Sequence, residues 1–120
     1  MKVSGRELTE YKTVQLWMAG PVDSMQARLR RHNLRVLSDF CVHRNIDPDA
    51  MIAAAATRDA KNDFMRVLKN WVKTYVTDER DRHDAENAVR SFFIANGLRV
   101  ITKPYSDVYH RPNLRDAPRD

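Results

Sequence analysis

Apolar side chains recur along this chain mainly at intervals of three or four residues, which places them on one face of a helix. The clearest case lies within residues 60–76, where aliphatic and aromatic residues alternate with polar ones at this spacing. They are Phe64, Leu68, Trp71, Val72 and Tyr75. Because a helix buries such a face against the rest of its protein, we expect residues 60–76 to form a long amphipathic helix.

The same spacing predicts further helices and little else. Their expected ranges are 6–18, 24–44, 48–56 and 80–96. We expect residues 1–5 to be a loose end, and strand signals are absent apart from a short extended piece or strand stub at 98–101. The expected fold is therefore all-α, a compact bundle of four to five helices.

Turn and cap residues indicate where these helices begin and end. Gly20-Pro21 stops the first helix, and Asp23 is a suitable N-cap for the second. Asp47-Pro48 has the pattern of an N-cap followed by proline at the first helical position. Asn96-Gly97 is a helix-stop signal, since glycine readily adopts the left-handed conformation. These signals support the helix ranges given above.

The composition changes after the last predicted helix. Residues 102–120 hold three of the five prolines and lack a long apolar repeat. We therefore divide the chain into a helical domain over residues 1–101 and a proline-containing linker or tail over residues 102–120, which needs a partner to become ordered. A length of 120 residues fits one domain of this kind.

Charge and cysteine content narrow the class of protein. The chain has 21 basic and 16 acidic residues, a formal net charge of +5 and a pI near 9.7, which permits binding to nucleic acid without requiring it. Cys41 is the only cysteine, so no intramolecular disulfide can form, which fits a reducing compartment. No apolar run is long enough to span a membrane. We expect a soluble, cytoplasmic protein, associated with the nucleoid if it is prokaryotic, and no membrane partner.

The residues that usually carry catalysis or hold cofactors form no recognisable set. One cysteine and four scattered histidines give no zinc-ligand spacing. No complete catalytic triad and no phosphate-binding loop is present. The sequence therefore predicts no metal, no cofactor and no enzymatic activity.

One face of the predicted helix 24–44 is strongly basic. It carries Arg28, Arg31, His32 and Arg35, which fall at i, i+3, i+4 and i+7. Arginine suits nucleic acid, because its planar fork can hold a phosphate or the edge of guanine with two hydrogen bonds. We therefore expect this stripe to contact DNA. The alternative is a solvated cationic face with local acidic partners such as Asp39.

Two further groups of polar residues are candidates for DNA contact. The first is a second stripe, on the helix 80–96, made of Arg80, His83, Asn87 and Arg90. Asparagine can read adenine through two hydrogen bonds, although Asp84 and Glu86 lie nearby and would repel phosphate. The second group is Lys69 and Lys73, two like charges one helical turn apart, which hints at an anionic partner. A solvated surface is the alternative for both groups.

The order of these elements resembles a known family. Tyrosine recombinases, among them phage integrases and archaeal integrase-like proteins, open with a small helical core-binding domain, described as SAM-like, in which two helices typically end in hydrophobic-x-x-Phe. The pattern occurs here as Leu37-Ser38-Asp39-Phe40 and again within residues 88–98, a segment that ends in Asn96-Gly97-Leu98 and is followed by Pro104. The resemblance covers roughly residues 10–104. It implies a SAM-like fold that clamps duplex DNA at a recombination site.

The catalytic half of that family has no counterpart here. Tyrosine recombinases cut DNA with a C-terminal domain that carries an Arg, a His-x-x-Arg box and a nucleophilic Tyr. The His-x-x-Arg of this chain, His32 to Arg35, lies in the second predicted helix and belongs to the basic stripe. Tyr105 and Tyr109 lie in the tail, which is too short to build the set of cations that activates a tyrosine. The resemblance thus implies a DNA-clamping domain that catalyses nothing.

Two functions from different classes remain open. The first is a DNA-binding domain of the recombinase type. Its partners would be double-stranded DNA and, because tyrosine recombinases assemble on DNA as multimers, further copies of itself or of a recombinase. The second is a helical protein-interaction or oligomerisation module with no nucleic-acid role, in which Ala53–Ala56 and the first helix dock a partner.

Overall fold

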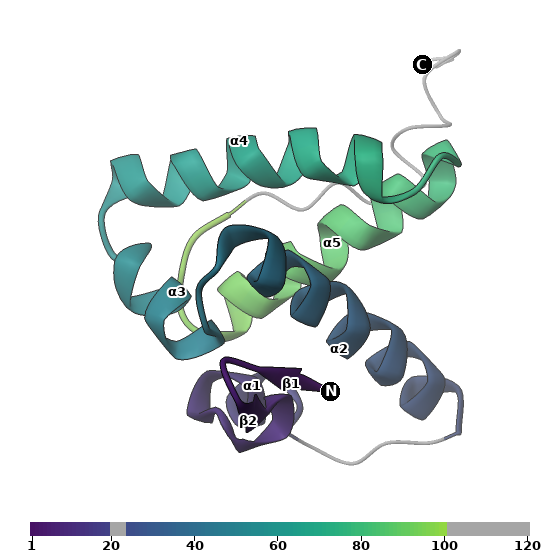
Figure 1. Cartoon of the computed structure of the whole chain (residues 1–120), viewed down its shortest axis with the longest axis horizontal. Helices are drawn as coiled ribbons and strands as arrows, with labels where there is room; N and C mark the ends of the chain where they lie inside the picture. The colour runs from purple at the N-terminus through teal and green to yellow at the C-terminus, as the bar shows by residue number, and fades with distance from the viewer. Residues whose placement is uncertain (20–23, 101–120) are drawn as a thin grey trace, which may run out of the picture.

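Five α-helices make up most of the protein in a computed structural model, which describes residues 1–19 and 24–100 (Figure 1). They are α1 (Lys12–Trp17), α2 (Ser24–Arg44), α3 (Pro48–Ala54), α4 (Arg58–Tyr75) and α5 (Glu79–Ala95). The prediction of an all-α bundle is confirmed. The predicted N-cap at Asp23, the Gly20-Pro21 stop and the tail 102–120 lie outside the described residues.

The N-terminal segment differs from the predicted loose end and early helix. Strands β1 (Lys2–Val3) and β2 (Arg6–Glu7) pair antiparallel, and the short 3-10 helix η1 (Leu8–Glu10) follows. Ser4 and Gly5 both have positive φ, 53° and 82°, which is the backbone of a tight hairpin turn. The Tyr11 hydroxyl donates to the Val3 carbonyl at 2.6 Å. Because Tyr11 itself is extended, the helix predicted from residue 6 begins only at Lys12.

Side-chain caps start the later helices close to their predicted positions. The Asp47 carboxylate accepts from the Ala50 amide at 2.7 Å ahead of Pro48, so the predicted cap is confirmed. Thr57 accepts from the Ala60 amide, which starts α4 two residues earlier than predicted. Asp78 accepts from two amides at the start of α5.

Left-handed residues end α2 and α5. Gly97 has φ +86°, and the Leu98 amide donates to the Phe93 carbonyl at 3.0 Å, so the predicted stop after α5 is confirmed. Asn45 has φ 54° and ends α2 in the same way, with the Ile46 amide donating to the Cys41 carbonyl at 3.1 Å. Residues 98–100 form no strand.

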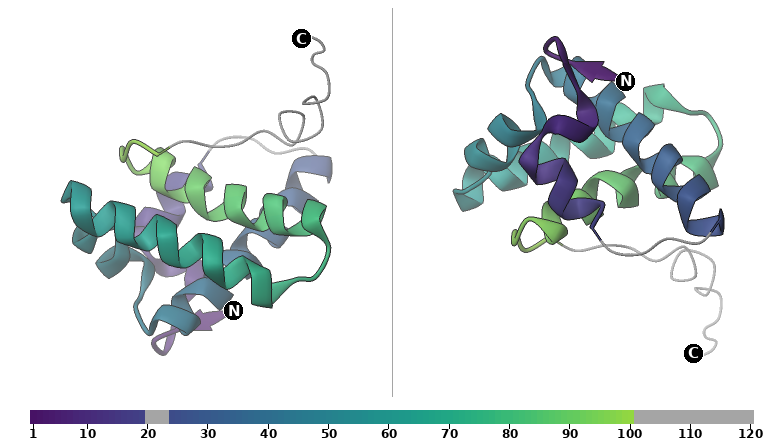
Figure 2. Two further views of the ribbon diagram at one scale, coloured as in Figure 1. Left: turned by 90° about the horizontal axis from the view of Figure 1, so that it is seen from above. Right: turned by 90° about the horizontal axis from the view of Figure 1, so that it is seen from below.

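Helix α5 is the centre of the core and packs against α1, α2 and α4 (Figures 1 and 2). Phe92 and Phe93 of α5 are completely buried. The Trp17 ring of α1 meets the Phe92 ring edge to face at 5.3 Å, and its indole N–H donates to the Ser91 hydroxyl. The core therefore forms around α5, at the point where α1, α2 and α4 pack against it.

In the described part of the chain, no helix is both long enough and apolar enough to cross a membrane.

A hydrogen-bonded link between α1 and α3 gives a stability test. The Asp49 carboxylate accepts from the Thr13 amide at 3.0 Å and from the Thr13 hydroxyl at 2.6 Å. Burial by itself would raise the pKa of Asp49, but these hydrogen bonds outweigh it and hold the pKa below its ordinary value. We expect Asp49→Ala to lower the free energy of unfolding by about 1–2 kcal/mol at neutral pH.

The pH dependence of that loss follows from the direction of the shift. A carboxyl whose pKa is lowered in the folded state stabilises the protein above its unfolded pKa, about 3.9, and ceases to do so as the pH falls through the folded pKa. Urea unfolding of the unmodified protein and of Asp49→Ala should therefore show that the difference between their free energies of unfolding shrinks below about pH 4. A difference that is absent at neutral pH would contradict this reading.

Candidate nucleic-acid interface

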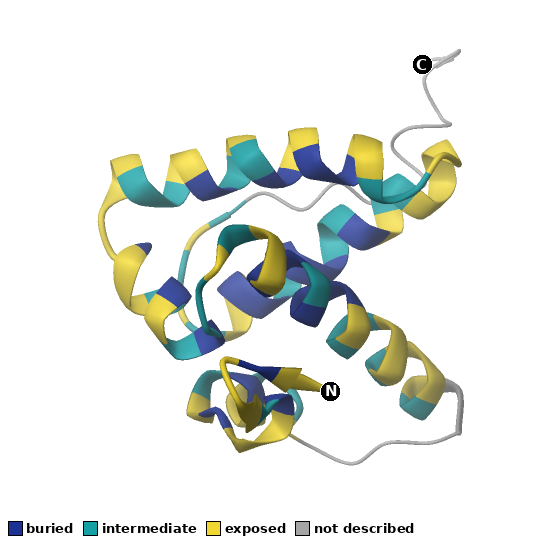
Figure 3. Ribbon diagram, viewed as in Figure 1, coloured by how far each residue is buried: buried dark blue, intermediate teal, exposed yellow. Residues whose placement is uncertain are grey.

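Helix α2 is buried in its second half and uncovered in its first. Val36, Leu37, Phe40 and Cys41 are buried, whereas none of the residues 26–35 is. Figure 3 shows the start of this helix as exposed and half-buried ribbon that projects past the other elements. Arg30 connects the first half of α2 to the end of α1, because its guanidinium donates to the Met18 carbonyl at 2.7 Å. The core thus holds one half of α2 and leaves the other open to a partner.

The predicted basic stripe lies on this uncovered half. All four of its side chains are exposed: Arg28, Arg31, His32 and Arg35. Within residues 1–19 and 24–100, none of the three arginines makes an ion pair. We call these four residues the α2 basic ridge. Three guanidinium groups are therefore free to meet an external anion.

The acidic partner that the alternative reading assigned to this stripe is engaged elsewhere. The Asp39 carboxylate accepts a hydrogen bond from the Tyr75 hydroxyl of α4 at 2.6 Å, and no ion pair joins it to Arg35. Burial, together with this hydrogen bond and the charge of Asp39, raises the pKa of Tyr75 to about 12. Tyr75 is therefore a neutral donor at physiological pH, since the nearby charge of Arg35 offsets only part of this rise.

A groove of about 300 Å³ runs along one side of the ridge, between α2 and α5. Leu29, His32 and Asn33 line it from α2, and Asp84 and Asn87 line it from α5. The structure thus brings Asn87, from the second predicted stripe, next to the ridge. The Leu29 side chain at its rim is 56% exposed.

Arg90 is not a surface residue. Its side chain is only 9% exposed and lies 2.8 Å from the Glu86 carboxylate, whose side chain is itself 14% exposed. The second predicted stripe is therefore split, because α5 packs on both α2 and α4 and has little free face. Arg80 stays exposed at the start of α5, and His83 lies on the side of α5 that faces α4.

Lys69 and Lys73 are exposed but do not join the ridge. They line a separate hollow of about 160 Å³ between α4 and α5, together with Arg82, Glu79 and Glu86. Two carboxylates beside these lysines reduce the positive potential there. The hollow that holds the two lysines lies on the opposite side of α5 from the groove beside the ridge.

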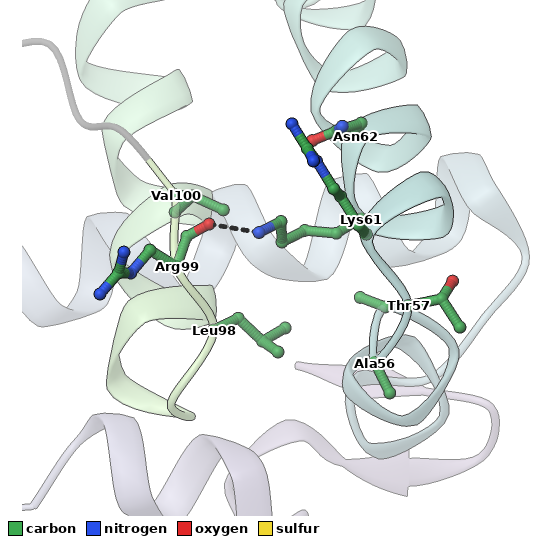
Figure 4. Close-up of a pocket in the computed structure, with 9 residues that line it drawn as sticks. Ala56, Thr57, Lys61, Asn62, Leu98, Arg99 and Val100 are labelled. Carbon is green, nitrogen blue, oxygen red and sulfur yellow. Dashed lines mark hydrogen bonds between the residues drawn. The ribbon is translucent and has the colours of Figure 1, made fainter.

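A third basic region lies at the start of α4, and the sequence did not predict that Lys61 and Arg99 come together there. Thr57, Arg58 and Lys61 face Leu98 and Arg99 across a hollow of about 610 Å³. Figure 4 shows the Lys61 ammonium reaching the Arg99 carbonyl, a hydrogen bond of 2.6 Å, while the Arg99 side chain points away from it. Only the turn at Gly97, which carries the chain back along α4, brings these residues together.

Among the described residues, no three histidine, cysteine, aspartate or glutamate side chains gather in a way that could hold a metal ion. Comparison with protein families, with curated proteins and with solved structures gives no match to this chain.

The contrast between Arg90 and the ridge predicts different costs of substitution. Arg90→Ala leaves the Glu86 carboxylate unpaired in a largely buried position and should lower the free energy of unfolding by about 3 kcal/mol. Arg31→Ala removes an exposed side chain without an ion pair and should change it by less than about 0.5 kcal/mol. Urea unfolding followed by circular dichroism measures both. Equal stability of the two variants would show that the Arg90–Glu86 pair does not stabilise the fold.

Proposed function

We propose that this protein binds duplex DNA through the α2 basic ridge. The observation that carries the proposal is a set of three exposed guanidinium groups without ion pairs on the half of α2 that the core leaves uncovered. The ridge gathers these three positive groups on one uncovered helix surface, in a chain whose 21 basic residues outnumber its 16 acidic ones, and such a concentration of positive charge favours an external anionic partner.

The dimensions of the ridge suit the duplex. Arg28 and Arg35 are seven residues apart, which is about 10 Å along a helix axis. The major groove of B-DNA is about 12 Å wide, which matches the diameter of an α-helix with its side chains, so α2 could lie in the groove with its arginines spread along that length. Arginines along such a helix can each hold a phosphate, or the O6 and N7 edge of guanine, with two hydrogen bonds. Asn87 lies beside His32 in the adjoining groove and supplies a secondary contact.

Within this proposal, the chain acts as a core-binding domain like that of tyrosine recombinases. The two hydrophobic-x-x-Phe patterns support it, since Leu37, Phe40, Val89 and Phe92 are all completely buried and belong to two helices in contact. The domain would clamp a recombination site from one side of the duplex. Cutting and joining of the strands would belong to a catalytic domain on the other side, and multimers would assemble on the DNA.

One observation favours the alternative, a helical protein-interaction module. Of Ala53–Ala56, which this alternative assigns to docking a partner, only Ala55 is buried in the fold. The other three alanines are exposed and could receive a partner helix. This alternative requires no DNA binding, so the experiment below separates the two functions.

The proposal predicts the salt dependence of two single variants. Each phosphate contact contributes about 0.9 to the slope of log K against log salt, because neutralising a phosphate releases condensed counterions. We therefore expect Arg31→Ala and Arg35→Ala each to make the slope less negative by about 0.9 and to weaken binding at low salt. Fluorescence anisotropy of a labelled duplex, titrated at several salt concentrations, measures both quantities.

Arg66→Ala is the matched control, because Arg66 is an exposed arginine of α4 that is paired with Asp63. We expect it to keep the slope of the unmodified protein. If both ridge variants keep affinity and slope unchanged, the ridge is not a DNA-binding face. If the unmodified protein does not bind DNA at about 50 mM salt, the interaction module becomes the better account.

A further inference from the structure

Arg35 and Asp39 lie one helical turn apart on α2, a spacing at which opposite charges usually meet. They form no ion pair here. Instead, the Asp39 carboxylate accepts a hydrogen bond of 2.6 Å from the Tyr75 hydroxyl, which comes from the end of α4. The partner of the Asp39 carboxylate is therefore Tyr75 of α4 and not the neighbouring arginine on α2.

Tyr75 is held firmly in place to make this bond. Its ring stacks on the Trp71 ring with centroids 4.4 Å apart, and the Trp71 ring in turn packs on Phe40 of α2 at 5.1 Å. Because this packing already fixes the Tyr75 ring, the side chain loses little rotational freedom when its hydroxyl bonds to Asp39. A hydrogen bond to an ionised carboxylate is also stronger than one between two neutral groups. The competing Arg35–Asp39 pair would be largely exposed and has the less favourable order along a helix, with the base before the acid.

We propose that Tyr75 is a positioning residue for DNA binding, which keeps Arg35 available by engaging Asp39. The inference rests on the proposed function, since Arg35 is one of its three ridge arginines. By turning the Asp39 charge towards α4, Tyr75 also keeps a negative group from facing a phosphate at that end of the ridge. Without the hydroxyl, Asp39 is released to pair with Arg35, and the ridge loses one of its phosphate contacts.

The test is Tyr75→Phe, which removes only the hydroxyl and keeps the stacked ring. We expect the salt slope of duplex binding to become less negative by about 0.9, the value of one phosphate contact, as for Arg35→Ala. Adding Arg35→Ala to Tyr75→Phe should then cause little further loss, because both changes remove the same contact. If the two losses add in full, Tyr75 does not act through Arg35 and the inference is wrong.

Rescue separates this role from a merely structural one. The double variant Tyr75→Phe with Asp39→Asn lacks the same hydroxyl but has no carboxylate to capture Arg35. We expect it to regain the salt slope of the unmodified protein. If the double variant stays as weak as Tyr75→Phe alone, the hydroxyl supports the local packing and the inference is overturned.

A measurement without DNA distinguishes failure of this inference from failure of the proposed function. In ¹⁵N-labelled protein, the Nε–H group of Arg35 should show a larger heteronuclear NOE in Tyr75→Phe than in the unmodified protein, because pairing with Asp39 orders its side chain. If the protein binds no DNA but this ordering occurs, the control of Arg35 by Tyr75 stands and the DNA function falls. An unchanged Arg35 signal overturns the inference.

Discussion

The aromatic side chains of α5 hold the protein together at the point where α1, α2 and α4 converge. Phe92 and Phe93 are completely buried there, and Trp17 and Phe64 meet their rings from two other helices. A helix that packs on three neighbours has little face left for solvent. This constraint explains both the burial of Arg90 and its pairing with Glu86, because a guanidinium inside such a junction needs a carboxylate beside it.

The same junction gives α2 its two halves. The core covers α2 only around residues 36–41, so the turns before them project beyond the bundle. The three exposed arginines on these turns change the stability of the fold little in either direction. Their arrangement is explained by an anionic partner more readily than by stability, and duplex DNA is the partner that we propose for them. Tyr75 links this face to the core, since its stacked ring reaches Asp39 from α4.

Local sequence signals predicted the helices well because their physical causes are local. Apolar spacing marked α4 and α5, Asp47-Pro48 and Gly97 set ends of α3 and α5, and four positions at helical spacing marked the ridge. The hairpin at Ser4 and Gly5 was missed, because two-residue strands carry almost no periodic pattern. Its stability depends on a hydrogen bond from Tyr11, whose partner Val3 could not be identified from sequence.

The sequence did not predict how the helices pack against one another. The spacing of Arg90 and Asn87 on α5 was compatible with one DNA-binding stripe, yet packing buried the first and placed the second beside α2. Lys69 and Lys73 likewise fell on the side of α4 that faces α5, apart from the ridge. The engagement of Asp39 by Tyr75 joins residues 36 positions apart and follows only from how α4 crosses α2.

The most direct test of the central claim is to map the DNA contact on the protein itself. Backbone amide shifts of the ¹⁵N-labelled chain, followed by NMR during titration with a duplex at about 50 mM salt, locate the bound surface residue by residue. The α2 basic ridge predicts that the largest changes fall on residues 28–35, with smaller ones near Asn87. The absence of changes, or changes concentrated around Lys69 and Lys73, would contradict it.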